Sequence, residues 1–334
     1  MTVTVLRRAL VVGIAALLVG QPDAAAQQAA KVRRVGWIVT TSPVAELEGA
    51  TPAHPSAYQL VQRLRELGYV EGRNLVLERR SAEGRFERFP DLIKDLVRLK
   101  TDVILTTEVA MTREAQRITP TIPIVFVTSD DPVQAGLVTS LARPDRNVTG
   151  FTTIGQEIVG KRVEILTEAF PATLRIAYLG LRSNWEGLEG RSLRAAASTI
   201  GVSIFLAEHQ GSDYSQAFAR IQKEADAVLP ANNAPNVGHR KHIVDRLAQM
   251  RLPALYPYRM FVDAGGLMSY GPDLPTLYRG VAEYTARILE GTSPGELPIQ
   301  QPTRFDLVIS LKAARALGFT IPPSLLRRAD RVIE

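Results

Sequence analysis

The sequence predicts an α/β protein made of two lobes, each a doubly wound sheet of parallel strands. Short apolar runs alternate with segments of helical period from about residue 33 onward, which is the pattern of parallel α/β folds. Residues 102–107 form a nearly continuous Val-Ile-Leu run, typical of a strand buried on both faces. The alternation restarts after residues 147–151, where Pro144, Asn147 and Gly150 interrupt it, so two similarly built lobes are expected.

The first half is expected to hold four strands joined by amphipathic helices, the first of which ends at Gly68. The predicted strands are residues 35–40, 74–78, 102–107 and 122–128, and the predicted helices are residues 57–67, 89–100, 110–117 and 133–141. In the second half the strands are expected at residues 175–180, 202–207, 227–229, 253–256 and 267–270. Helices are expected there at residues 155–168, 188–200, 214–225, 239–250 and 274–289.

The N-terminus has the features of a secretory signal peptide over residues 1–26. Arg7 and Arg8 precede an uncharged apolar run at residues 9–20, and the small residues 24–26 supply a cleavage site. The apolar run is shorter than the roughly 20 residues that a membrane-spanning helix needs. Because the chain contains no Cys, a lipid anchor through a cysteine thiol is excluded. We therefore expect an exported, soluble protein that is not lipid-anchored.

Composition and motifs argue against nucleic-acid binding and against the common enzyme classes. The net charge of +6 comes from basic residues scattered among acidic ones, which predicts an ordinary solvated surface and no nucleic-acid partner. The sequence lacks the nucleophile elbow, the dinucleotide-binding glycine loop, the phosphate-binding P-loop and the zinc-binding HExxH helix. His239 and His242 flank two cations on a predicted helix, and His54 and His209 lie in predicted loops. We expect no catalytic residue, no cofactor and no metal.

Polar residues recur at the carboxyl ends of the predicted strands, where open parallel sheets bind their ligands. Hydroxyl, amide and phenol groups there can hold a small polar ligand without reacting with it. The candidate ligand-binding residues are Thr40, Ser42, Thr106, Thr107, Glu108, Thr128, Asp130, Asn184, Trp185, Asn232, Asn233, Tyr256, Tyr258 and Tyr270.

The sequence permits more than one role for Asp130 and for Trp185. Asp131 is expected to cap the turn or helix that begins at Pro132, which leaves Asp130 open to a ligand role. Trp185 is either a core residue or a stacking surface in the cleft, whereas Trp37 lies in a buried-type strand and is expected in the core.

Several ordered motifs of the chain resemble those of ABC transporter substrate-binding proteins related to tryptophan and tyrosine uptake components. In the first half these are LGYVEGRN (67–74), AEGRFERFP (82–90), IPIVF (122–126), DPVQAGLV (131–138), LARP (141–144) and NVTG (147–150). In the second half they are GGLMSYG (265–271), QPTRFDLV (301–308) and LGFTIPPS (317–324). The chain departs from many relatives at Asn184-Trp185 and Asn232-Asn233, where they carry Asn-Pro and Asp-Pro.

This resemblance implies a type I periplasmic-binding-protein fold whose two lobes are joined by a three-segment hinge. The crossings are expected near Gly150, near Gly271 and near residues 298–304. Lobe 1 would then comprise residues 33–149 and 272–298, and lobe 2 residues 150–271 and 299–334.

The resemblance further implies a monomeric solute-binding component of an ABC importer. It would capture a small polar or aromatic/carboxylate metabolite, amino-acid-like, by hinge closure and pass it to an inner-membrane permease. A periplasmic sensor that presents its ligand to a membrane receptor has the same fold and is the alternative. A secreted enzyme is the third class.

Overall fold

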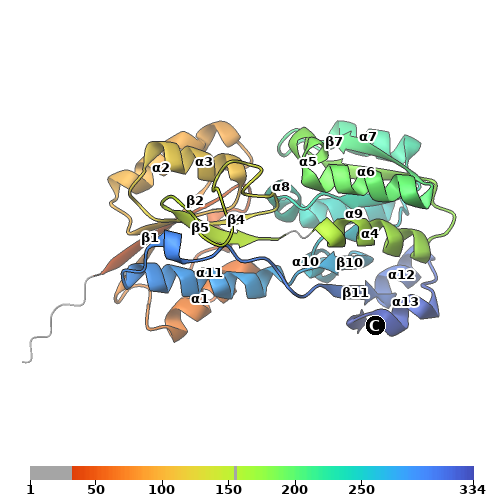
Figure 1. Ribbon diagram of the computed structural model, residues 1–334. Coiled ribbons are helices and arrows are strands. Elements are labelled where there is room, and N and C mark those ends of the chain that lie inside the picture. Colours follow the sequence, from red (N-terminus) through yellow and green to blue (C-terminus); the bar gives the residue numbers. More distant parts are fainter. Residues whose placement is uncertain (1–31, 154–155) are drawn as a thin grey trace, which may run out of the picture. The chain divides into compact units, whose positions relative to one another are not determined.

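The computed structural model describes residues 32–153 and 156–334, and the predicted signal peptide at residues 1–26 lies outside them (Figure 1). Within these residues the strands form a five-stranded, a four-stranded and a three-stranded sheet. None of the described helices is both long enough and apolar enough to cross a membrane.

The five-stranded sheet is entirely parallel and has the order β2-β1-β3-β4-β5. Its strands are β1 (Arg33–Val39), β2 (Leu75–Ser81), β3 (Val103–Thr106), β4 (Ile124–Thr128) and β5 (Val148–Thr152). The chain order reverses between β1 and β3, because β2 lies on one side of β1 and β3 on the other. The loops that follow the carboxyl ends of β1 and β3 therefore run to opposite sides. This reversal of strand order is a topological switch point, and open α/β sheets form their binding crevice there.

Helices cover both faces of this sheet (Figure 1). Helix α1 (Pro55–Glu66) packs against α11 (Leu274–Leu289) on one face, and α2 (Phe89–Arg98) packs against α3 (Val109–Ile118) on the other. Successive residues of β1 point to opposite faces, so Trp37 joins the core under α1 and α11 while Ile38 joins the core under α2 and α3.

The remaining two sheets lie in the second half of the chain. The three-stranded sheet has the order β7-β6-β8 and contains β6 (Arg175–Gly180), β7 (Ser203–Glu208) and β8 (Ala227–Pro230), all parallel. The four-stranded sheet has the order β12-β11-β10-β9 and contains β9 (Leu255–Tyr256), β10 (Met268–Gly271), β11 (Asp306–Ser310) and β12 (Arg331–Ile333). A parallel bridge between Val228 and Ala254 links the two. The β10–β11 pair is antiparallel, because β11 returns from the opposite direction after α11.

The other described helices all lie in the second half. They are α4 (Gln156–Ala169), α5 (Arg182–Glu186), α6 (Leu188–Ile200), α7 (Ser215–Glu224), α8 (Ala234–Gly238), α9 (Arg240–Gln249), α10 (Arg259–Asp263), α12 (Leu311–Leu317) and α13 (Pro323–Arg328). Three 3-10 turns complete the described structure, at Val44–Glu46, Phe86–Arg88 and Pro294–Glu296.

Helix α11 connects the two halves in the way the family resemblance implies. It follows β10 in sequence yet packs against α1. The chain then passes β5, where the amide of Thr152 donates to the carbonyl of Gln300 (2.9 Å), before it enters β11. The exact lobe boundaries stay a prediction.

The predicted helix over residues 133–141 is wrong. These residues form a series of turns, in which Gly136 adopts the left-handed region (φ 68°) and ends the helical conformation. Asp131 nevertheless caps the first turn, because its Oδ1 accepts hydrogen bonds from the amides of Val133 (2.8 Å) and Gln134 (3.2 Å).

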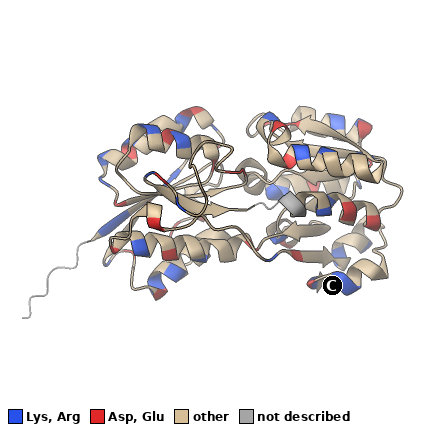
Figure 2. Cartoon of the chain, in the orientation of Figure 1, with Lys and Arg blue, Asp and Glu red and all other residues tan. Residues whose placement is uncertain are grey.

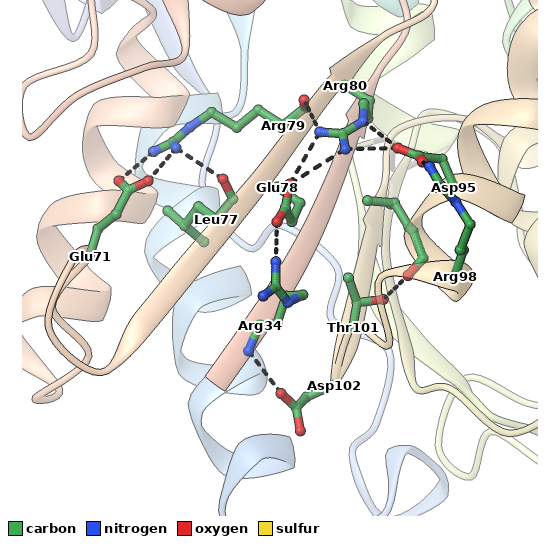
Figure 3. A network of polar contacts seen from close by, with 11 residues as sticks. Arg34, Glu71, Leu77, Glu78, Arg79, Arg80, Asp95, Arg98, Thr101 and Asp102 are labelled. Atoms are coloured by element: carbon green, nitrogen blue, oxygen red, sulfur yellow. Dashed lines mark hydrogen bonds and ion pairs between the residues drawn. The ribbon is translucent and has the colours of Figure 1, made fainter. Parts of the chain in front are cut away.

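Positions of Lys and Arg alternate with positions of Asp and Glu along the helices, as the colours of the ribbon in Figure 2 show. A network of charged side chains secures the edge strand β2 (Figure 3). Arg80 bonds to Asp95 of α2 (2.7 Å), Glu78 pairs with Arg34 of β1, and Arg79 forms two bonds with Glu71 (2.6 and 2.8 Å). Charges along an edge strand also oppose its pairing with other chains.

Candidate ligand-binding cleft

A small cavity lies at the carboxyl edge of the five-stranded sheet, at the switch point between β1 and β3. Residues that follow β1, β3 and β4 form one wall, together with the start of α1, and residues that follow β8 or precede α10 form the other. Its volume is about 70 Å³. The lining residues are Trp37, Val39, Thr40, Thr41, Ser42, His54, Ser56, Thr107, Glu108, Val127, Thr128, Ser129, Thr153, Asn232, Asn233, Ala234, Val237, Tyr258, Leu274 and Tyr278.

The N-terminus of α8 is in direct contact with the loops that follow β1 and β3. The amide of Ala234 donates to Glu108 Oε1 (3.2 Å), and Thr41 Oγ1 donates to the carbonyl oxygen of Ala234 (3.0 Å). Gly238 lies so close to this loop that a Cβ atom there would be 1.9 Å from Thr41 Oγ1. The two halves of the chain thus meet at the cavity through polar contacts and a close approach that only glycine permits.

The side-chain amides of Asn232 and Asn233 each donate and accept hydrogen bonds within the protein. Asn232 Nδ2 donates to Thr153 Oγ1 (3.0 Å), and its Oδ1 accepts from the Tyr258 hydroxyl. Asn233 Oδ1 caps α8 by accepting from the amide of Asn236 (2.8 Å), while its Nδ2 donates to Asn184 Oδ1 (2.7 Å). These amides therefore hold the shape of the wall.

A buried ion pair supports this wall from behind. Arg162 and Glu189 are 2% and 4% exposed and bond at 3.0 Å, and Glu189 also accepts from the Tyr178 hydroxyl (2.7 Å). The same carboxylate accepts from the amide of Asn232 (3.2 Å), and Arg162 Nε donates to the carbonyl of Tyr270 (2.9 Å). The pair therefore positions the β8–α8 loop. Nothing in the sequence indicates it, because the two residues lie 27 positions apart on different helices.

Burial shifts the pKa values of the ionisable groups in and beside the cavity. Desolvation, with the nearby charge of Asp130, raises the pKa of Glu108 to about 8, although the Ala234 amide opposes this. Desolvation, with Glu189, raises the pKa of Asp130 to about 6. Burial and, second, Arg240 lower the pKa of His54 to about 4. At neutral pH Glu108 and His54 are therefore mainly uncharged.

No lysine or arginine lines the cavity in the described part of the chain. Across residues 32–153 and 156–334, no three His, Asp or Glu side chains converge in a way that could hold a metal ion. Any charge on a ligand would have to be met by hydroxyl groups, backbone amides and neutral side chains.

The sequence-predicted site residues divide into two groups. Those that line the cavity are Thr40, Ser42, Thr107, Glu108, Thr128, Asn232, Asn233 and Tyr258. Their role in ligand binding stays a prediction, but the strand-end rule brings them together as expected.

The other predicted residues lie outside the cavity lining. Thr106 bonds to the hydroxyl of Thr112 (2.8 Å), and Tyr256 stacks on Phe261 in the core with ring centroids 5.1 Å apart. Asn184 bonds to Asn233, as described above, and Asp130 lies beside Gly187. Tyr270 is half-buried and packs near Phe305.

Trp185 lies at a different hollow of the surface, with Arg182 and Glu208. The guanidinium of Arg194 stacks over its ring at 4.3 Å. The structure thus places this side chain against α6 and away from the cavity described above.

Seven polar or aromatic residues of the cavity lining were not among the predicted site residues: Trp37, Thr41, His54, Ser56, Ser129, Thr153 and Tyr278. Trp37 is 1% exposed, as a core residue is, yet its side chain also lines the cavity. Its ring centroid lies 5.7 Å from that of Tyr278 of α11, another lining residue. His54 and Ser56 flank Pro55 at the start of α1. The Pro at the first helical position was the available signal, since it marks a helix N-terminus beside the switch point.

Comparisons with known proteins agree with this architecture. The sequence profile of the family described as ABC transporter substrate binding protein matches residues 52–333. A Tyrosine-binding protein from Clostridioides difficile is 24% identical over 272 residues, which make up 79% of this chain and 78% of that protein.

Two solved structures are similar over most of their length. A conserved domain protein from Vibrio cholerae is 27% identical with a TM-score of 0.79, and the match covers 90% of this chain and 100% of that one. An ABC domain from Streptococcus pneumonia in complex with L-Trp is 21% identical with a TM-score of 0.77, and the match covers 90% and 99%. The predicted type I periplasmic-binding-protein fold is confirmed. Because the family profile extends over most of its length, the chain belongs to the ABC transporter substrate binding protein family.

Proposed function

We propose that this chain is the periplasmic solute-binding component of an ABC importer. It captures a small polar or aromatic/carboxylate metabolite, amino-acid-like, between the two halves of the chain and delivers it to an inner-membrane permease. The signal peptide predicted at residues 1–26 would export it, and it would act as a monomer free of nucleic acid and without enzymatic activity. Relatives whose names specify tyrosine, or whose structures contain L-Trp, support the amino-acid-like class.

The observation that carries this proposal is the cavity at the switch point, which both halves line and close. Its volume of about 70 Å³ is well below the roughly 300–1,000 Å³ of typical small-molecule sites. A metabolite can enter only if the Glu108–Ala234 and Thr41–Ala234 contacts separate. The ligand would then favour closure through its greater affinity for the closed form, as in other hinge-bending receptors.

Calorimetric titration with a panel of amino acids and aromatic acids, paired with small-angle scattering, tests the proposal. We expect at least one saturable ligand, and that ligand should reduce the radius of gyration. Absence of both binding and compaction across the panel would contradict the proposal.

A glycine substitution tests closure itself. In Gly238→Ala the new Cβ meets Thr41 Oγ1 and Cβ, at 1.9 and 2.6 Å, so the closed form is disfavoured. Overpacking costs about 1–3 kcal/mol, so we expect affinity to fall roughly 5- to 150-fold and ligand-induced compaction to be lost. Gly160→Ala on α4 is the matched control, because its Cβ meets only Ala196 at 3.5 Å. Adding Thr41→Gly to Gly238→Ala removes the clashing side chain and should restore part of the compaction.

A further inference from the structure

Three residues that line the cavity each carry a buried polar atom that has no hydrogen-bond partner. These atoms are Trp37 Nε1, His54 Nδ1 and Ser56 Oγ, in side chains that are 1%, 6% and 1% exposed. Each such atom costs about 1–3 kcal/mol when buried without a partner. The other unpaired buried atoms in the described residues belong to Arg79, Thr152, Arg162, His209 and Ser269, which are not among the lining residues. Three unpaired polar atoms in the residues around one cavity indicate a site where a bound ligand supplies the missing hydrogen-bond partners.

Helix geometry adds further donors at the same place. His54 precedes α1 and makes no side-chain cap bond, Pro55 has no amide proton, and Ser56 follows it. The first amides of a helix have no partner within the helix, and the helix dipole places partial positive charge there. The wall formed by β1 and the start of α1 thus combines helix amides with three side chains that each carry one unpaired polar atom.

The chemistry of these groups specifies a hydrogen-bond acceptor. The indole N–H of Trp37 can only donate, and the Ser56 hydroxyl and the neutral imidazole of His54 can each donate one proton. The low pKa of His54 keeps the ring uncharged at neutral pH, so it donates without bringing a full charge. A carboxylate, which accepts up to about four hydrogen bonds, fits this set better than an amide or a hydroxyl.

We propose that Trp37, His54 and Ser56, together with the N-terminus of α1, form the subsite that binds the carboxylate of the ligand. The proposal rests on the proposed function and assigns one end of the bound molecule. The remainder of the ligand would extend toward Glu108 and the Asn232–Tyr258 wall.

Matched pairs of acids and their primary amides test this subsite in calorimetric titrations of the wild-type protein. The pairs are L-tyrosine and L-tyrosinamide, L-tryptophan and L-tryptophanamide, L-leucine and L-leucinamide, and benzoate and benzamide. We expect at least one acid to bind, and its amide to bind at least 30-fold more weakly, because the carboxamide group lacks the negative charge of the carboxylate and offers a donor where the site needs an acceptor.

Two variants then identify the residues. Trp37→Phe removes the indole N–H but keeps an aromatic ring beside Tyr278, and Ser56→Ala removes the hydroxyl. Each should weaken binding of the acid about 5- to 30-fold and leave binding of the amide nearly unchanged, so the acid-to-amide ratio falls. Ser269→Ala is the control, since Ser269 is also 1% exposed with an unpaired hydroxyl but does not line the cavity. If Trp37→Phe does not fold, Ser56→Ala alone carries the test.

The outcomes separate this inference from the proposed function. Equal affinity for an acid and its amide in the wild type would overturn the subsite and leave the proposed function standing, because water alone would then satisfy the three atoms. If the variants lost acid and amide binding equally, Trp37 and Ser56 would have only a structural role, and the carboxylate subsite would also be overturned. If no compound of the panel binds, the proposed function fails, and the subsite fails with it.

Discussion

The two walls of the cavity differ in how completely their polar atoms are paired. On the wall from the second half of the chain, Asn232 bonds to Thr153, Tyr258 and Glu189, and Glu189 in turn bonds to Arg162. On the wall from β1 and α1, three buried polar atoms have no partner. Asn232 and Glu189 thus find partners within the protein, although Arg162 Nη2 behind them has none, whereas the other wall carries three unpaired buried atoms in residues that line the cavity. Under the proposed function, this division would let one wall keep its shape while the unpaired atoms of the other bind the ligand.

The largest expected effect comes from breaking the paired wall. Arg162→Met leaves Glu189 buried without its ion-pair partner, which should lower the free energy of unfolding by about 3–5 kcal/mol. Urea denaturation measures this. Arg328→Met is the matched control, because its pair with Glu168 is exposed and should cost at most about 1 kcal/mol. Equal losses in the two variants would show that the buried network does not stabilise this wall.

A pH titration of stability sharpens the comparison at Glu108, which lies between the walls. Its pKa of about 8 in the folded protein exceeds the ordinary 4.5, so the folded state holds a proton that the unfolded state releases. The contribution that protonated Glu108 makes to the free energy of unfolding is fully present below pH 4.5 and is lost as the pH rises to 8.

Between pH 6.5 and 8 this loss should reach at most ~2 kcal/mol. In the folded state His54, with a pKa of about 4, and most of Asp130, with a pKa of about 6, have already lost their protons in this window. In the unfolded state His54 has its ordinary pKa of 6.5, so it adds only a small slope of opposite sign near pH 6.5. Urea denaturation across the window should therefore show a negative slope. The slope should disappear in Glu108→Gln, which keeps an oxygen to accept from Ala234, and a slope that persists there would assign the effect to another group.

The smallest effect compares one hydroxyl from each wall. Tyr258→Phe removes the bond to Asn232 and leaves a buried amide oxygen short of a donor, so it should cost about 1 kcal/mol. Ser56→Ala removes a hydroxyl that has no partner, so the ligand-free protein should be equally stable or gain up to about 1 kcal/mol. Thermal unfolding of both variants without ligand measures the difference. A destabilised Ser56→Ala protein would contradict the view that this wall is incomplete.

Local sequence patterns predicted much of the fold. The continuous apolar run of β3 predicts a buried strand, and the helical spacing of the apolar residues in α1 predicts a helix. The prediction of a helix at residues 133–141 was wrong because Gly136 adopts a positive φ, which interrupts the helix that the spacing of apolar residues predicts. The antiparallel β10–β11 pair could not be predicted, since it depends on where α11 packs before the chain returns.

The candidate site was predictable only as far as one topological rule extends. Polar residues after parallel strands were expected to meet, and Thr40, Thr107 and Thr128 do lie at one cavity. Trp37 was missed because its position within β1 marks it as core, and only the tertiary structure shows that the core here borders a hollow. Trp185 was expected at the cleft as one of two alternatives, but it packs beside Arg194.

The sequence by itself determined the fold class, the strand-end residues and the family motifs, because these depend on period and on short-range order. The tertiary structure alone decided which polar groups are paired and which are not. Arg162 meets Glu189, and Trp37 shares a cavity with His54, through contacts between elements distant in sequence. Hydrogen bonding in a buried site depends on angles and distances of a few tenths of an ångström, and no pattern of residue types along a chain specifies these.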